Sequence, residues 1–292
     1  MAEKIPAPAR KKFEEERKHI HNFVKSKEKF KGGESKYEKI KLGVPGFDEM
    51  IKSGGIPKAT SVLICGGPGT GKTILCLQTL YNKAREGKKC LYMSFEESED
   101  RLVDHMKKFG WDVDPLIKGG KLKIVRLDPF GITRSVRALL EKAKGELMID
   151  IEPVLLPDGY VPDFVVMDSL SSISSAFVGR EESYRTYLEQ LFKLFEKLGA
   201  TSFLIAETEQ VHLGVLSRMG VEEFLADAII VMYNVMHSNK RYRGIEILKV
   251  RGAQHVGNIV SLDITEKGMI VHPNKQLFTE LDMPPGVRAA DD

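Results

Sequence analysis

The feature that most constrains the fold is the stretch GGPGTGKT at residues 66–73. It matches the pattern G-x-x-x-x-G-K-[ST], in which glycines let successive backbone N–H groups face a chain of phosphates. The apolar run SVLIC precedes it, and residues 72–85 have helical character up to Gly87. A strand that enters such a loop and a helix that leaves it are the usual setting of a phosphate-binding loop. We therefore expect an α/β fold with this loop at the carboxyl end of a strand.

Strands and helices alternate along the residues that follow the loop. The expected strands are the apolar runs at 90–95, 122–127, 164–168 and 201–206, and the expected helices lie at 98–109, 132–144 and 183–198. This alternation predicts a mostly parallel central sheet with helices on both faces. Between 228 and 272 the strand-like segments are separated only by turns, which predicts an antiparallel C-terminal extension.

Charge and composition divide the chain into three parts. Residues 1–41 carry 13 Lys or Arg against 7 Asp or Glu, while the whole chain has a net charge of +3. We expect a basic N-terminal helical extension at 1–37, one nucleotide-binding domain at 38–273 and a C-terminal tail at 274–292. Segment 145–162 is apolar yet broken by three prolines, so we expect an insertion there. The extension could contact an anionic partner or simply cap the domain.

The loop predicts a site for a nucleoside triphosphate with Mg²⁺. Lys72 is expected to reach the β and γ phosphates, and the Thr73 hydroxyl is expected to hold the metal ion. The apolar strand DFVVMD ends at Asp168, which we place on the metal side of the site. The predicted nucleotide contacts in the loop are Gly67, Pro68, Gly69, Thr70, Gly71, Lys72, Thr73 and Ile74.

Two adjacent acids, Glu96 and Glu97, follow the strand at 90–95. Hydrolysis needs a carboxylate that orients or deprotonates the attacking water, and we assign that role to Glu96. Glu97 is the second candidate, since neighbouring residues on a strand point in opposite directions. Either acid could instead have only a structural role, as a negative charge next to the positive N-terminal end of the following helix.

The chain resembles the KaiC-type branch of the RecA-like ATPases, which is widespread in archaea. The resemblance covers roughly residues 38–273. It rests on GVPGFDEMIKSGGIP before the loop, SFEES, VVMDSLSS, RMGVEEFLADAIIVM and KVRGAQH. It implies a RecA-like P-loop core, ATP and Mg²⁺ as cofactors, and a ring, commonly a hexamer, with ATP between adjacent subunits.

The resemblance also gives a role to KVRGAQH. Lys249 and Arg251 are separated by one residue on a predicted strand, so their side chains are expected on one face. In the family, matching cations reach the γ-phosphate held by the next subunit, where they would stabilise charge in the transition state. His255 is implied as a further contact to the nucleotide of the neighbouring subunit, unless it is an ordinary surface histidine. The chain has one such core, whereas the clock protein that names the family has two, so a clock function is not implied.

Four functions remain open at this point. The leading one is a ring-forming ATPase whose nucleotide state controls an unidentified protein partner. The second is a nucleotide-dependent scaffold or switch with negligible turnover. The third is a recombinase-like ATPase that acts on DNA, although Arg180, Arg185 and Arg218 form no strongly basic stripe. The fourth is a weak autokinase activity on the serines after Asp168.

The sequence also bears on the compartment. No run of about 18 apolar residues is present, and the N-terminus lacks the apolar centre of a signal peptide. Three cysteines without metal-ligand spacing are typical of reduced core residues. We therefore expect a cytoplasmic protein without membrane insertion.

Overall fold

The computed structural model describes residues 38–142, 156–157, 159–208, 220–237 and 239–277. The predicted N-terminal extension, most of the predicted tail and part of the predicted insertion lie outside these residues. None of the helices within the described ranges is long and apolar enough to cross a membrane.

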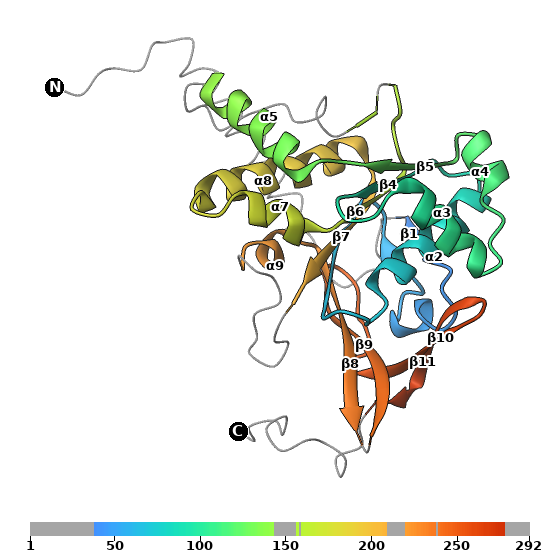
Figure 1. Cartoon of the computed structure of the whole chain (residues 1–292). Helices are drawn as coiled ribbons and strands as arrows, with labels where there is room; N and C mark the ends of the chain where they lie inside the picture. The colour runs from blue at the N-terminus through green and yellow to red at the C-terminus, as the bar shows by residue number, and fades with distance from the viewer. Residues whose placement is uncertain (1–37, 143–155, 158, 209–219, 238, 278–292) are drawn as a thin grey trace, which may run out of the picture. The chain divides into compact units, whose positions relative to one another are not determined.

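A nine-stranded sheet dominates the described part of the chain, in the order β11-β10-β9-β8-β3-β7-β6-β4-β5 (Figure 1). The strands are β3 (Ser61–Gly66), β4 (Cys90–Ser94), β5 (Leu122–Arg126), β6 (Phe164–Asp168), β7 (Thr201–Glu207), β8 (Ala228–His237), β9 (Lys240–Val250), β10 (Val260–Thr265) and β11 (Gly268–Gln276). The strands from β8 across to β5 pair in parallel, and β9, β10 and β11 continue from β8 in antiparallel pairs. This confirms the expected mostly parallel sheet and its antiparallel C-terminal extension.

Helices cover both faces of the parallel strands (Figure 1). They are α2 (Lys72–Arg85), α3 (Glu99–Lys108), α4 (Asp114–Lys118), α5 (Pro129–Lys142), α7 (Leu170–Ala176), α8 (Glu181–Leu198) and α9 (Glu222–Leu225). On β3, Val62 and Ile64 pack into a core with α2 and α3, while Leu63 and Cys65 pack into a second core with α5, α7 and α8. The strand is therefore buried on both faces, which explains its unbroken apolar sequence.

The lead-in segment before β3 docks onto the last strand of the sheet. It contains the short strands β1 (Lys39–Ile40) and β2 (Ile56–Pro57) and the 3₁₀ turn η1 (Asp48–Met50). Val271 N donates to Pro45 O at 2.8 Å, and Phe47 is fully buried. Gly46 has a φ of 79°, and a Cβ added there would lie 1.9 Å from Val271 O. The second glycine of GVPGF, Gly46, is thus required by the close approach of β11.

Gly46→Ala is expected to lower the free energy of unfolding more than Gly54→Ala does. Gly54 has a φ of 74° but no atom within 4 Å of an added Cβ, so its substitution carries only the left-handed penalty of about 1–2 kcal/mol. Gly46→Ala adds a collision with backbone and is expected to cost well over about 2 kcal/mol. Urea unfolding of both variants measures the difference, and equal losses would contradict the docking of this segment.

Candidate nucleotide-binding site

The phosphate loop leaves β3 at Gly66 and wraps around the ammonium group of Lys72. Gly69 and Gly71 have φ values of 72° and 104°, a region that favours glycine. Lys72 Nζ donates to Gly66 O at 2.7 Å and to Gly67 O at 2.9 Å. Burial lowers the pKa of Lys72, and nearby carboxylates, that of Glu207 foremost, oppose this shift. The ammonium group is therefore held at the centre of the loop, next to the N-terminus of α2, where an anion is favoured.

Asp168, at the end of β6, lies directly beside the loop. Its Oδ2 atom accepts hydrogen bonds from Thr73 Oγ1 at 2.9 Å and from Tyr92 OH at 2.5 Å. The side chain is buried, and this burial raises the pKa of Asp168 while the two hydroxyl groups oppose the shift. One hydroxyl oxygen and one carboxylate oxygen next to a phosphate loop fit a Mg²⁺ ion that takes its other ligands from phosphates and water. The described residues contain no cluster of three or more His, Cys, Asp or Glu that could hold a metal ion.

Glu96 lies just after β4 and faces the first turn of α7. Its Oε1 atom accepts hydrogen bonds from Ser169 Oγ at 2.8 Å and from Ser172 Oγ at 3.1 Å. Ser169 follows Asp168 directly and caps α7 by accepting a hydrogen bond from Ser172 N. The exposed Glu96 carboxylate is thus oriented by two hydroxyl groups at the edge of the sheet that carries Asp168.

Glu97 faces a different element. Its Oε2 atom lies 3.6 Å from Arg101 Nε and 3.7 Å from His105 Nδ1, both on α3. The backbone N–H groups of Glu96 and Glu97 both donate to Ser94 Oγ, at 3.3 and 2.9 Å. The two neighbouring acids therefore have separate surroundings, and only Glu96 contacts the serines next to Asp168.

The structure also brings residues to this edge that the sequence reasoning missed. Glu207 ends β7 opposite Gly66, and its N–H donates to Ser171 Oγ at 2.8 Å. An acid at a strand end is the signal that identified Asp168, and it could have identified Glu207 as well. Tyr92 gave no such signal, since it reads as one more apolar residue of a buried strand.

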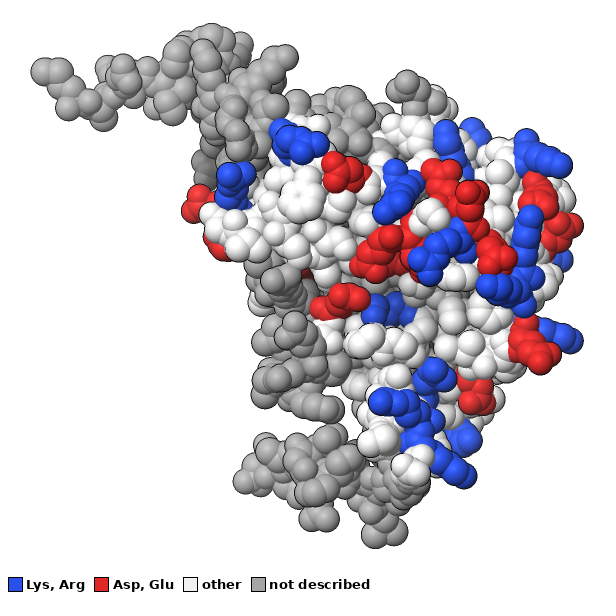
Figure 2. Space-filling model, in the orientation of Figure 1, with Lys and Arg blue, Asp and Glu red and all other residues white. Residues whose placement is uncertain are grey.

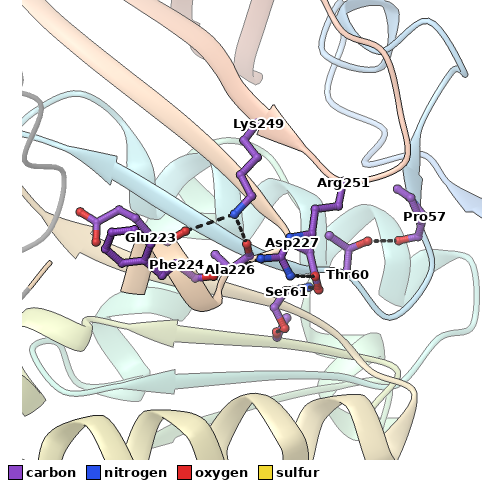
Figure 3. A network of polar contacts seen from close by, with 10 residues as sticks. Pro57, Thr60, Ser61, Glu223, Phe224, Ala226, Asp227, Lys249 and Arg251 are labelled. Carbon is purple, nitrogen blue, oxygen red and sulfur yellow. Dashed lines mark hydrogen bonds and ion pairs between the residues drawn. The ribbon is translucent and has the colours of Figure 1, made fainter. Parts of the chain in front are cut away.

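Lys249 and Arg251 contact the segment between α9 and β8 (Figure 3). Lys249 Nζ donates to Ala226 O at 2.6 Å and to Glu223 O at 3.2 Å, and Arg251 Nη1 lies 3.2 Å from Asp227 Oδ1. Burial, and then the charge of Arg251, lowers the pKa of Lys249. The sequence pattern predicted that Lys249 and Arg251 both lie on a strand. This is correct for Lys249 but wrong for Arg251, because β9 ends at Val250. Both side chains nevertheless reach the same segment.

These two cations are remote from the phosphate loop of their own chain. Met232 on β8 pairs with Gly66, whereas Ala228 pairs with Val62 on β3 and with Val250 on β9. Along the strand direction, Val250 therefore lies four residues, roughly 13 Å, from the level of Gly66. The structure brings together the loop, Asp168 and Glu96, and it leaves Lys249 and Arg251 at the opposite edge.

His255 lies outside the phosphate site as well. It is half-buried and forms an isolated bridge with Ile51 in the lead-in segment. Its Nδ1 atom is 3.1 Å from Val256 O.

The comparison with known families identifies the chain. Residues 40–276 match the family model described as "ATPase: KaiC". The chain belongs to the KaiC family of ATPases. This confirms the resemblance stated from the sequence and makes the chain a nucleotide-binding protein with a KaiC-type ATPase domain.

Individual relatives agree with the family match. The circadian clock protein KaiC3 of Synechocystis is 34% identical over 237 residues, which cover 81% of this chain and 46% of that protein. A UPF0273 protein of Thermotoga maritima is 31% identical over 243 residues, which cover 82% of this chain and 97% of that protein. The crystal structure of a KaiC-like protein from Pyrococcus horikoshii OT3 superposes with a TM-score of 0.66 at 32% identity, covering 81% of this chain and 100% of that one.

The relatives differ in length. The chain spans less than half of the cyanobacterial clock proteins it matches, but nearly all of the Thermotoga protein. It therefore carries a single KaiC-type domain, and the whole-protein activities of the clock relatives do not transfer directly.

Asp168→Asn is expected to stabilise the fold at pH 7. Burial raises the pKa of Asp168, so the folded protein binds this proton more tightly than the unfolded chain does. The stability that the protonated form contributes is therefore lost as pH rises through the raised pKa. The neutral amide removes this cost, for a gain of about 1 kcal/mol in the free energy of unfolding. The gain shrinks as pH falls toward the ordinary value of 3.8.

Urea unfolding at several pH values tests this, with the exposed Asp112→Asn as the matched control. The control is expected to change stability by less than about 0.5 kcal/mol at every pH. A destabilised Asp168→Asn protein at pH 7 would contradict the account of the buried carboxylate.

Proposed function

We propose that this KaiC-family domain hydrolyses ATP with Mg²⁺ at a site shared between copies of the chain in a ring. The observation that carries the proposal is the placement of Glu96: two serine hydroxyls orient its carboxylate at the strand edge that also holds Asp168 and Lys72. A carboxylate fixed at this point is what a water-activating base requires. A site that only senses nucleotide would not need it.

Each residue of the site then has a defined task. Lys72 and the N–H groups of the loop bind the β and γ phosphates, and Thr73 and Asp168 hold Mg²⁺. When bound, Mg²⁺ neutralises charge that develops on the phosphate oxygens. Glu96 orients the attacking water and accepts its proton, while Ser169 fixes the direction of the carboxylate.

The sharing of the site between subunits rests on the position of Lys249 and Arg251. The register of β8 and β9 places Lys249 three strand residues, roughly 10 Å, from the level of its own phosphate loop, and Arg251 lies further along the chain in the same direction. Cations next to the γ-phosphate lower the barrier to phosphoryl transfer. A second copy of the chain is the source that supplies them, in the ring that the family resemblance implies.

The regulatory role of such a ring is a further part of this proposal. A single KaiC-type core with slow turnover can report its nucleotide state to a protein partner through the subunit interfaces. The scaffold without turnover remains the competing function, and the next experiment separates the two.

Glu96→Gln is expected to lower kcat for ATP hydrolysis by about 100-fold or more, with ATP affinity nearly unchanged, because the amide cannot accept a proton. Glu97→Gln is the matched control and is expected to keep most of the activity, since Glu97 faces α3. Steady-state phosphate release and equilibrium binding of a fluorescent ATP analogue measure both quantities. Tight binding by the wild type without turnover would favour the scaffold.

Mixing two inactive variants tests the sharing of the site. Glu96→Gln removes the base but leaves the cations, and Lys249→Ala/Arg251→Ala does the reverse. In a randomly mixed ring, about a quarter of the sites combine an intact base with intact cations from the neighbour, so activity is expected to return on mixing. Glu96→Gln mixed with Lys72→Ala is the control. Both residues belong to the subunit that supplies the phosphate loop, so no site in a mixed ring combines an intact base with an intact loop. Mixed rings without recovered activity would contradict the shared site.

A further inference from the structure

The β8–β9 hairpin carries a strongly basic strip at its tip. Lys240, Arg241 and Arg243 occupy three of the first four positions of β9, with Tyr242 between the two arginines. No acidic residue occurs anywhere from 228 to 245. Figure 2 shows Lys and Arg side chains gathered at the end of the molecule where β8 and β9 reach their tips. These cations belong to residues that the structure describes, not to the predicted extension at 1–37.

Apolar and aromatic surface lies among these cations. Met236 is 68% exposed and Tyr242 is 43% exposed. The register places Met236 opposite Arg241, and Val235 opposite Tyr242. Cross-strand partners share a face of the sheet, so each face of the hairpin combines a cation with an apolar or aromatic neighbour.

The neighbouring acids are already engaged. Glu246, further along β9, accepts a hydrogen bond from Tyr233 OH, and Asp263 on β10 lies 2.9 Å from His272 Nε2. Lys240 and Arg241 form no ion pair with another described residue. Their charge is therefore available to an external anion.

The base of the strip is fixed to the phosphate loop. Arg243 is half-buried, and its Nε atom donates to Gly69 O at 3.0 Å. Arg241 lies two residues nearer the tip on the same face, about 7 Å further along the strand. The hairpin is thus a two-stranded arm whose base contacts the phosphate loop.

We propose that this hairpin binds single-stranded nucleic acid. Lys240 and Arg241 neutralise phosphates of the bound nucleic acid, and the Tyr242 ring provides a face on which one of its bases stacks. An acidic peptide would use the cations alone and would leave the exposed aromatic ring without a role. The surface acts independently of ATP hydrolysis, so its test does not require turnover.

The test uses the full chain and a fluorescently labelled oligothymidine in anisotropy titrations at several salt concentrations. Lys240→Ala/Arg241→Ala removes two cations, and the slope of log affinity against log salt is expected to fall by about 1.4. Lys118→Ala/Lys193→Ala is the matched control, because both lysines are exposed and lie on other elements. This control is expected to keep the slope of the wild type.

Tyr242→Ala separates stacking from charge. It is expected to weaken binding by about 5-fold or more while leaving the salt slope unchanged. The proposal fails if the wild type shows no salt-dependent binding, or if the Lys240/Arg241 variant binds as tightly as the wild type. It also fails if Tyr242→Ala has no effect and polyglutamate displaces the oligonucleotide, since the surface would then suit an acidic protein.

Discussion

The parallel pairing of β3 with β7 on one side and β8 on the other is the constraint on which the site depends. It buries β3 completely and fixes the point at which the phosphate loop begins. Because the carboxyl ends of parallel strands meet at one edge of a sheet, Asp168, Glu96 and Glu207 converge on Lys72 there. The short first turn of α7 then connects these strand ends through its serine hydroxyls.

A second constraint is the change of direction at β8. This strand runs parallel to β3 but antiparallel to β9. The reversal carries the end of β9, with Lys249 and Arg251, to the edge of the sheet opposite the phosphate loop. It also returns the start of β9 to that loop, where Arg243 contacts Gly69. One topological feature thus divides the proposed catalytic groups between subunits and places a basic hairpin beside the nucleotide site.

The sequence predicted those parts of the site that rest on a local rule. The glycine pattern identified the phosphate loop and the bounds of α2, and a strand ending in an acid identified Asp168. It did not predict α7, because a serine-rich segment has weak helix propensity and its hydroxyls compete for backbone groups. The sequence therefore did not predict that Glu96 accepts hydrogen bonds from Ser169 and Ser172. The apolar pattern GIEILKV marks a strand only from Gly244, whereas β9 begins at Lys240. A hairpin tip exposed on both faces has no apolar alternation to mark it.

The most direct test of the shared site is ATP turnover per subunit, measured with Mg²⁺ across a range of protein concentrations while sedimentation follows the assembly. A site that takes Lys249 and Arg251 from a neighbour requires turnover per subunit to rise as the assembly forms and then to level off. Turnover per subunit that stays constant from the single chain to the full assembly would show that one copy is sufficient, and would contradict the account.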